Sequence, residues 1–486
     1  MRIAVVHYHL QTGGVTRVIR HAGESLRGRG ASLVVLSGAP PAEPLPVEVR
    51  VVPGLRYEAE RPDMSPHALA VELSATAAEA IGGPPDIWHF HNHSLGKNLL
   101  VPECVLELAR ACHHLLLQIH DFPEDGRPRN YRALRQALAD SRGRTSRLFE
   151  TLYPIADHVH YAVLSERDGD ALREAGAPGR QVHTLPNAVS LDPVDDQTQT
   201  GPESEARLWL YPTRAIRRKN LGEFLLWAAM AGNTERFATT RGPENPLEKP
   251  AYDDWRAFAA RLDLPMDFGV GERCGDFAAL LKSAHAMVTT SVAEGFGLAF
   301  LEPWLTGKAV AGRDLPEQTS DFRDEGVDLN HLYQRVAVPR DWFDDETLRN
   351  KARSALEHSM SSYGRVPGPG DAERALRAWT HGDTIDFGRL DEALQQQAIL
   401  RIARSDGGRR DVSPTALALP EPGSGVVSHN RRIIEETWGI EAYGDRLLGL
   451  YEDMLATPAS HTPGALDGDR LLDRFLAPER LYLLRN

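Results

Sequence analysis

Short apolar runs alternate with amphipathic helical patterns along residues 1–190. Residues 3–6 form an apolar run of the kind expected for a strand buried on both faces, and a glycine-containing loop at 11–14 follows it. Residues 15–26 then place apolar side chains at helical spacing. Further strands are predicted at 32–36, 87–90, 115–119, 160–164 and 182–187, with helices at 99–111 and from Glu166 onward. Repeated strand–helix units of this kind predict a doubly wound parallel sheet.

A second series of strand and helix patterns begins near residue 208. Residues 190–205 are acidic and polar, which is typical of a linker between domains. Strands are predicted at 208–212, 286–290 and 309–311, and helices at 221–230, 276–283 and 298–306. We therefore expect two α/β domains, at residues 1–195 and 205–426, with a cleft between them. Residues 357–426 are predicted to be a helical insertion, and residues 427–486 to be an amphipathic helix at 433–455 plus a tail.

Composition and charge exclude several classes of protein. A chain of 486 residues is long enough for two or three domains. Its 68 acidic and 55 basic residues give a net charge of −13, which argues against a general nucleic-acid binder. Three cysteines without C-x-x-C spacing argue against a disulfide scaffold and a structural zinc site. Because the apolar stretches are too short or too charged for a signal peptide or a membrane span, we expect a cytoplasmic protein.

Residues 294–302, EGFGLAFLE, form the sharpest local pattern in the chain. A predicted strand runs into a Ser/Thr-rich loop, then a Gly-x-Gly sequence, then a predicted helix. Glycines there allow backbone N–H groups to approach an anion, and a helix N-terminus adds positive potential. If Glu294 and Glu302 lay on one helix, they would be about 12 Å apart, which is too far for a glycosidase carboxylate pair. The alternative is a surface turn with a buried capping glutamate.

A run of cations, Arg214 to Asn220, follows the first strand of the second domain. Cations at the carboxyl end of a strand in an α/β sheet favour a phosphate-bearing ligand. The alternative is a solvated basic loop. Gly13 and Gly14 follow the first strand of the chain, but neither G-x-G-x-x-G nor a Walker P-loop is present, which argues against a nicotinamide-dependent enzyme and an ATPase.

Histidines are concentrated in the first domain. His89, His91 and His93 alternate, so on a continuous strand they would share a face and a metal site is conceivable. However, Asn92 and the Ser-Leu-Gly that follows His93 indicate that the strand has already ended. His120 and Asp121, at the end of a predicted strand, are better placed for substrate contact.

A second basic stretch lies in the first domain. Residues 127–147 contain seven arginines against a single acid, Asp140. Three interpretations remain open: a solvated helical face, a site for an anionic acceptor, or contact with an acidic membrane surface.

These features together resemble the GT-B glycosyltransferases, and among them the retaining family four, which includes sucrose- and glycogen-forming enzymes. Arg214 and Lys219 look like the family's Arg…Lys motif, and residues 294–302 like its Glu-x7-Glu motif. Residues 185–189, LPNAV, look like its Pro-Asn-Gly-Val segment at the end of the first domain. The predicted helix at 431–455 resembles the family's terminal helix, which implies that residues 427–486 cross back to the N-terminal domain. Departures are Ala188 and Asn220 in place of glycine, and Pro303 directly after Glu302.

The resemblance implies a fold, a reaction and a set of site residues. The fold is GT-B, two Rossmann-like doubly wound parallel-sheet domains that face each other across a cleft. The reaction moves a hexose from a nucleotide sugar to an acceptor, with retention of configuration and without a cofactor or metal. Arg214 and Lys219 are expected to neutralise the donor diphosphate, and Glu302 to bind the ribose hydroxyls. Glu294 and the backbone of Gly295, Phe296, Gly297 and Leu298 are expected to bind the sugar hydroxyls and the phosphate. Gly13 and Gly14 are expected to face the diphosphate, and His120 is expected to contact the transferred sugar.

The acceptor and the nucleotide base are not encoded in any motif of the sequence. The arginines of residues 127–147 suggest an anionic acceptor. Two other functions remain open: an epimerase or hydrolase acting on a nucleotide sugar, and a catalytically silent module that binds one.

Overall fold

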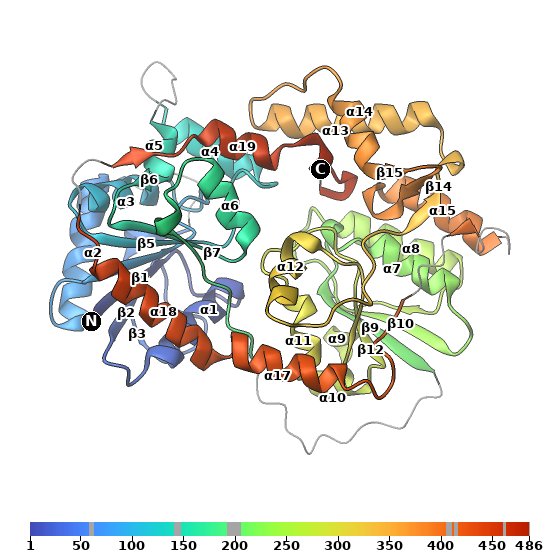
Figure 1. Cartoon of the computed structure of the whole chain (residues 1–486), viewed down its shortest axis with the longest axis horizontal. Helices are drawn as coiled ribbons and strands as arrows, with labels where there is room; N and C mark the ends of the chain where they lie inside the picture. The colour runs from blue at the N-terminus through green and yellow to red at the C-terminus, as the bar shows by residue number, and fades with distance from the viewer. Residues whose placement is uncertain are drawn as a thin grey trace. The chain divides into compact units, whose positions relative to one another are not determined.

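The computed structural model describes residues 1–57, 63–139, 147–191, 206–404, 411–412, 417–459 and 463–485. The chain forms two compact units, each built from three segments (Figure 1). Unit 1 contains Met1–Ala188, Ser362–Arg365 and Glu436–Leu476, and unit 2 contains Val189–Ser361, Val366–Glu435 and Ala477–Asn486. Most of the predicted 190–205 linker lies outside the described residues.

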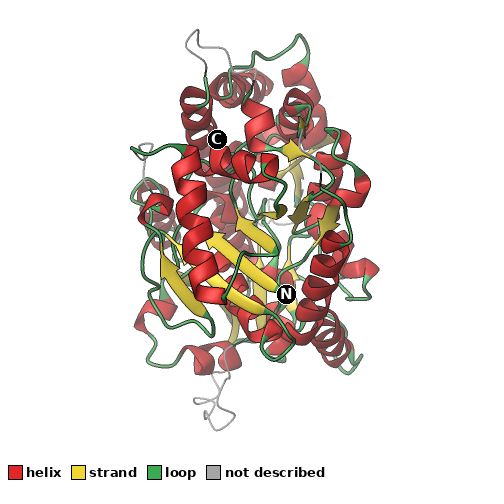
Figure 2. Cartoon of the chain, turned by 90° about the vertical axis from the view of Figure 1, so that its left-hand side faces the viewer, coloured by secondary structure: helices red, strands yellow, loops and turns green. Residues whose placement is uncertain are grey.

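Unit 1 is built on a seven-stranded parallel sheet in the order β3-β2-β1-β4-β5-β7-β8. Adjacent residues of β1 point to opposite faces, so Ile3 and Val5 join one apolar cluster while Ala4 and Val6 join another. Helices therefore cover both faces, as the sequence predicted, and Figure 2 shows helices lying against the strands. The strands are β1 (Arg2–His7), β2 (Ser32–Ser37), β3 (Glu48–Val51), β4 (Ile87–His91), β5 (His114–Ile119), β7 (Val159–Val163) and β8 (Val182–Thr184). The helices include α1 (Gly14–Leu26), α2 (Pro66–Ile81), α3 (Val101–Arg110), α4 (Pro128–Ala137), α5 (Leu148–Leu152) and α6 (Glu166–Glu174).

Unit 2 contains a five-stranded parallel sheet in the order β11-β10-β9-β12-β13. Three of these strands were predicted from the sequence, whereas β10 (Glu235–Arg241), β11 (Met266–Asp267) and the helix between them, α8 (Lys249–Arg261), were not. The strands are β9 (Arg207–Arg214), β10 (Glu235–Arg241), β11 (Met266–Asp267), β12 (Ala286–Thr289) and β13 (Val310–Gly312). The helices include α7 (Leu221–Met230), α8 (Lys249–Arg261), α9 (Val270–Arg273), α10 (Phe277–Ser283) and α12 (Pro316–Asp324).

The predicted insertion at 357–426 is not helical throughout. Two short strands, β15 (Thr380–His381) and β16 (Thr384–Asp386), form an antiparallel sheet with β14 (Ala337–Pro339). A turn at Gly382, whose φ is +56°, joins β15 to β16. The helices of this region are α13 (Asp345–Ser362), α14 (Asp371–Trp379) and α15 (Glu392–Arg404).

The single helix predicted at 433–455 is in fact two helices, α17 (Val426–Trp438) and α18 (Ile440–Leu455). Gly439 between them has φ −61° and ψ 163°, an extended conformation that interrupts the helix. α18 packs on α1 within unit 1, as Tyr443 and Leu447 share an apolar cluster with Val18 and Ile19. The tail then divides: α19 (Gly468–Phe475) belongs to unit 1 and residues 477–486 belong to unit 2. Among the helices in the described ranges, none combines the length and apolar character that crossing a membrane requires.

Candidate functional site

The basic loop of unit 2 is held in shape by Asn220. β9 ends at Arg214, residues 217–219 form a 3-10 turn, and Asn220 begins α7 with φ +52°. Asparagine tolerates this left-handed conformation better than other residues with a side chain, which explains why it stands where the resembled family has glycine. Its side chain donates to Glu223 Oε2 at 2.9 Å and accepts from Gln395 Nε2 at 2.8 Å.

Backbone carbonyls of the same loop are fixed by the segment that follows β12. Thr290 Oγ1 donates to Lys219 O at 3.1 Å, and Ser291 Oγ donates to Arg218 O at 3.2 Å. Tyr211 Oη, on β9, donates to Lys219 O at 3.0 Å. Because β9 and β12 are neighbours in the parallel sheet, these contacts join the carboxyl ends of the two strands.

Lys219, Arg218 and Glu294 meet at this edge. The Lys219 ammonium donates to Glu294 Oε1, and the Arg218 guanidinium donates to Glu294 Oε2 at 3.2 Å and to Ala293 O. The Lys219 and Glu294 side chains are only 13% and 9% exposed. Two cations against one carboxylate leave a net positive charge in a largely buried place, which suits a phosphate.

Protonation at this cluster follows from burial and charge. Burial lowers the pKa of the Lys219 ammonium, an effect that the Glu294 carboxylate opposes. Burial alone would raise the pKa of the Glu294 carboxyl, but Lys219 and Arg218 beside it hold that pKa below its ordinary value. Glu294 is therefore ionised at neutral pH and keeps both cations in place.

Arg214 is placed apart from this cluster. Its guanidinium lies 3.2 Å from Glu244, and the two side chains are 48% and 66% exposed. Arg217 is engaged elsewhere too, since it donates to both carboxylate oxygens of Glu392 at 2.6 and 3.0 Å. The structure thus brings Lys219 and Glu294 together, as the sequence suggested, but the arginine beside them is Arg218, which the motif spacing did not single out.

The glycine loop after Glu294 is shaped by packing. Gly297 has φ +100°, and a Cβ there would lie 3.2 Å from Phe300 and 3.3 Å from Phe322. Phe296 is buried with its ring edge-on to Phe322 at 5.5 Å between centroids. Gly295 is exposed and has open space around it, which agrees with a backbone that a ligand can approach.

The predicted helix over 298–306 is wrong in one respect: it is not continuous. Leu298–Phe300 is a 3-10 turn and Glu302–Leu305 is a separate single turn, α11. Pro303 lies in the first turn of α11, where its missing N–H leaves no hydrogen bond unmade. The separation of about 12 Å that assumed one helix from Glu294 to Glu302 therefore does not apply. A four-residue turn also lacks the long row of aligned peptides that the predicted dipole needs.

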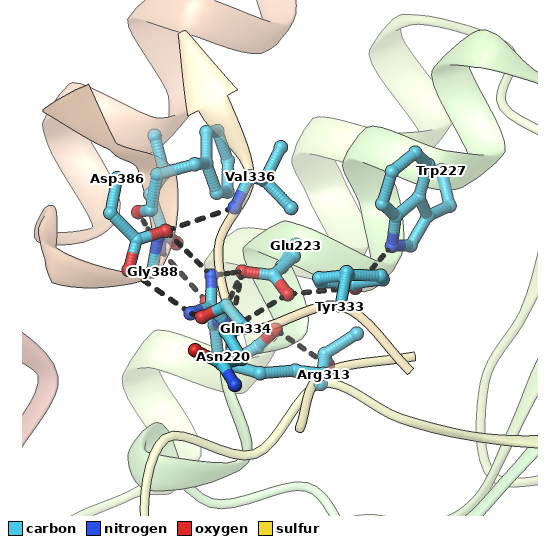
Figure 3. Close-up of polar contacts among 12 residues, drawn as sticks. Asn220, Glu223, Trp227, Arg313, Tyr333, Gln334, Val336, Asp386 and Gly388 are labelled. Atoms are coloured by element: carbon cyan, nitrogen blue, oxygen red, sulfur yellow. Dashed lines mark hydrogen bonds and ion pairs between the residues drawn. The ribbon is translucent and has the colours of Figure 1, made fainter. Parts of the chain in front are cut away.

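Behind the loop, a buried ion network ties α7 to β13 and β16 (Figure 3). Arg313, 1% exposed, donates to Glu223 at 2.6 Å and to Asp386 at 2.8 Å. Tyr333 Oη donates to Glu223 Oε1 at 2.9 Å and accepts from Trp227 Nε1 at 2.8 Å. A Cβ at Gly388 would lie 2.4 Å from the Arg313 guanidinium, so glycine is required there. Because Glu223 also binds Asn220, this network supports the loop that carries Lys219.

In unit 1, several histidines line the carboxyl edge of the sheet. His91 Nδ1 lies 2.8 Å from His120 Nε2, and the His89 and His91 rings stack at 4.4 Å between centroids. Asn92 Oδ1 accepts from the backbone N–H of His120 at 2.7 Å. Burial lowers the pKa of His89 to about 4 and that of His120 to about 3, so both rings are neutral at pH 7.

The three alternating histidines do not form a metal site. β4 ends at His91, Asn92 has φ +55°, and His93 turns away so that its Nε2 contacts Leu152 O at 2.7 Å. Within the described part of the chain, no group of three or more His, Cys, Asp or Glu side chains is arranged to hold a metal ion.

Gly13 and Gly14 are exposed at the N-terminus of α1, on the loop that follows β1. This position is at the carboxyl edge of the unit 1 sheet, as a diphosphate contact requires. Glu302 is the first residue of α11 and is partly buried.

Part of the arginine-rich stretch can be placed. Arg127 forms an ion pair with Asp121, and Arg135 donates to Tyr363 O at 3.3 Å. Arg129 and Arg132 are exposed on α4. Asp140, Arg142 and Arg144 lie outside the described residues.

Comparison with known proteins identifies the family of one segment of the chain. A family model described as Glycosyltransferase Family 4 matches residues 12–193. This segment is a Glycosyltransferase Family 4 domain. The glycosyltransferase match includes the Gly13–Gly14 loop and the histidine edge of unit 1. Over these residues the match agrees with the family that the sequence resembles.

Relatives resemble the chain along nearly its whole length. Mannosylglucosyl-3-phosphoglycerate synthase of Petrotoga mobilis is 26% identical over 527 aligned positions, which cover 99% of this chain and 98% of that protein. Sucrose-phosphate synthase of Thermosynechococcus elongatus superposes with a TM-score of 0.51 at 16% identity, covering 94% of this chain and 99% of that chain. Anabaena Alr3699/HepE in complex with UDP gives a TM-score of 0.52 at 13% identity, covering 93% and 100%. The fold is therefore the GT-B fold.

Proposed function

We propose that this protein is a retaining glycosyltransferase that moves a hexose from a nucleotide sugar to an anionic acceptor. The observation that carries the proposal is the meeting of Lys219, Arg218 and Glu294 at the carboxyl edge of β9 and β12. A buried surplus of positive charge at that place suits the diphosphate of a nucleotide sugar. In support, the Anabaena protein of the same fold binds UDP, and the Petrotoga relative is named as a synthase of a glycosylated product.

Charge development explains how such a site would accelerate transfer. When the anomeric C–O bond breaks, positive charge builds on the sugar and negative charge on the departing diphosphate. Lys219 and Arg218 are already in place, so they stabilise the leaving group without rearranging. The departing phosphate then accepts the proton of the acceptor hydroxyl on the same face of the sugar, which retains configuration and requires neither a metal nor a second carboxylate.

The acceptor proposal rests on the chemistry of the relative's product. A glycoside of 3-phosphoglycerate carries a phosphate and a carboxylate, so the Petrotoga enzyme's named product is strongly anionic. We expect an acceptor of the same class here, in the cytoplasm. The base and sugar of the donor stay open, and thermal shift with UDP, GDP and ADP sugars decides among them, because a ligand at ~100 Kd adds about 2.7 kcal/mol of stability.

Product analysis separates this function from its alternatives. Incubation with a nucleotide sugar and a glucoside of 3-phosphoglycerate should yield a glycosylated product of retained configuration. Free sugar or an isomerised donor would instead indicate a hydrolase or an epimerase. Binding without turnover would indicate a silent nucleotide-sugar module.

Lys219→Met tests the donor site directly. The variant should lower kcat by about a hundredfold or more, because it removes one preorganised cation from the leaving group. Lys249→Met, which changes an exposed lysine of the same unit, is the matched control and should leave kcat unchanged. Circular dichroism checks that both variants fold. Full activity in folded Lys219→Met would refute the donor-site assignment.

A further inference from the structure

Lys97 is a half-buried cation that has no acidic partner among the described residues. It lies on the loop between β4 and α3, and its ammonium donates to Tyr57 Oη at 2.6 Å. The same nitrogen lies 4.5 Å from the centroid of the Tyr57 ring. In the part of unit 1 that the structure describes, no carboxylate pairs with it. A phenol holds the ammonium in place but carries no charge that would compensate it.

His9 provides a second donor beside this cation. Its ring centroid lies 5.9 Å from that of Tyr57, and its Nδ1 accepts a long hydrogen bond, 3.4 Å, from the Gln11 N–H. In the neutral ring this places the proton on Nε2, which then donates. Burial and the nearby Lys97 charge lower the pKa of His9, which favours the neutral ring at pH 7.

A row of rings connects this pair to His120. The centroids of His9 and His7 are 5.6 Å apart and those of His7 and His91 are 6.2 Å apart, and His91 bonds to His120. These residues end or follow β1, β4 and β5, which are adjacent in the sheet. Lys97, His9 and His120 therefore lie along one carboxyl edge, where ligands of open α/β sheets bind.

The arginines that first suggested an anion site are less suited to the role. Arg127 is paired with Asp121, and Arg129 and Arg132 stand exposed on α4, where water screens their charge. Lys97 is less exposed than Arg129 and Arg132, and its hydrogen bond to Tyr57, a residue that is 51% exposed, holds it at this edge.

We propose that Lys97, with His9 and Tyr57, forms the subsite that receives the phosphate of the acceptor, so that an acceptor hydroxyl reaches the His120 end of the same edge. The inference rests on the proposed transferase function and adds to it the residues that select an anionic acceptor. A phosphate of the donor has the same chemistry, so the experiment compares the KM of each substrate.

Lys97→Met is the decisive variant, since methionine keeps the length and the apolar contact with Tyr57 but removes the charge. With a glucoside of 3-phosphoglycerate as acceptor, its KM should rise by about tenfold or more, because a hydrogen bond to a charged group is lost. The donor KM should not change, and methyl glucoside, which has no phosphate, should react equally with variant and wild type. Salt should raise the acceptor KM of the wild type but not of the variant. Tyr57→Phe should raise the acceptor KM by a smaller factor.

Arg132→Met is the matched control, because it removes an exposed cation of the same unit. A rise in the acceptor KM for Arg132→Met but not for Lys97→Met would overturn the proposal in favour of the α4 surface. A rise in the donor KM for Lys97→Met would overturn it in favour of the donor phosphate.

A binding measurement keeps the subsite separate from the reaction. Calorimetric titration with 3-phosphoglycerate needs no turnover, and the wild-type protein should bind it more tightly than Lys97→Met does. If no acceptor is glycosylated but this difference is observed, the proposed function fails and the subsite stands. If transfer occurs and neither the acceptor KM nor binding differs, the subsite fails alone.

Discussion

Arg313 shows how much one residue can matter away from the reacting groups. Its guanidinium bridges Glu223 and Asp386, and all three side chains are nearly or fully buried. A buried charge is tolerated only when it is paired, so removing the central cation leaves two carboxylates facing each other without water.

Arg313→Met should therefore lower the free energy of unfolding by about 3–5 kcal/mol. Arg273→Met provides the comparison: it breaks an exposed pair with Asp267 and should cost less than about 1 kcal/mol. Urea unfolding followed by tryptophan fluorescence measures both. Equal effects of the two substitutions would show that the buried network contributes little.

The buried histidines of unit 1 predict a dependence of stability on pH. Burial lowers the pKa of His7 to about 3 and that of His89 to about 4, against about 6.5 in the unfolded chain. Below pH 6.5 the unfolded chain binds protons that the folded unit does not, so their stabilising contribution is present above pH 6.5 and is lost as the pH falls toward 4. Tm should fall from pH 7 to pH 5, and the fall should be smaller in His89→Gln. If Tm falls equally with pH in His89→Gln and in the wild type, His89 does not contribute to the pH dependence of stability.

At this scale the sequence predicted Lys219 and Glu294 as site residues, and the structure places Arg218, which was not among the predicted site residues, in contact with Glu294 as well. The motif spacing points to Arg214, five positions before Lys219. Which arginine reaches Glu294 is decided by the 3-10 turn at 217–219 and by the left-handed Asn220, and neither is encoded in spacing. Lys97 was not predicted from the sequence either, because a single lysine in a loop belongs to no recognisable motif.

Between elements, α18 and α1 of unit 1 meet through a glycine. α18 approaches α1 so closely that a Cβ at Gly444 would lie 2.7 Å from the Ser25 Cβ. Glycine inside a helix is ordinarily unfavourable, so its presence here reflects packing.

Gly444→Ala should therefore destabilise the protein by about 1–3 kcal/mol, although alanine is the better helix former. Gly449→Ala in the same helix has no atom within 4 Å of the new Cβ and should stabilise by up to about 1 kcal/mol. Thermal unfolding of the two variants tests the contrast. A stabilising Gly444→Ala would mean that the helices separate at little cost.

Element boundaries were predicted well where apolar periodicity and burial agree. Residues 221–230 were predicted as a helix and form α7 over the same range. The helix predicted at 433–455 was less well predicted, because apolar spacing continues across Gly439 while α17 begins in unit 2 and α18 packs in unit 1. Periodicity records which positions are buried but not against which partner.

At the scale of the whole molecule, the last residues complete unit 2. Leu481 O accepts from the buried indole N–H of Trp379 at 2.9 Å and from Arg389 at 2.8 Å. The Arg389 guanidinium also lies 3.7 Å from the centroid of the Tyr482 ring.

A chain that ends at Leu476 should thus be less stable by at least the cost of an unpaired buried N–H, about 1–3 kcal/mol. Thermal unfolding measures the loss. Trp379→Phe should lower the free energy of unfolding less in the shortened chain than in the full chain, because in the shortened chain the Trp379 indole N–H has already lost its acceptor. An equal loss of stability from Trp379→Phe in the two chains would show that the hydrogen bond to Leu481 O does not account for the effect of the truncation.

The assembly of each unit from three separate segments was predicted only in part. The resemblance of the terminal helix implied its return to the first domain, and α18 lies in unit 1. Strand and helix patterns describe local order, so they gave no sign that residues 362–365 belong to unit 1 and residues 477–486 to unit 2. The sequence therefore predicted two parallel sheets and their order along the chain, but not which unit holds residues 477–486.

The return of α18 to unit 1 has a consequence for biosynthesis. During translation, Ile3, Val5 and Ile19 emerge from the ribosome hundreds of codons before Tyr443 and Leu447, which cover them in the finished protein. The nascent chain consequently carries an uncovered apolar face throughout most of its synthesis, a state in which chaperones protect against aggregation. The apolar face of unit 1 is covered only after α18 has been synthesised.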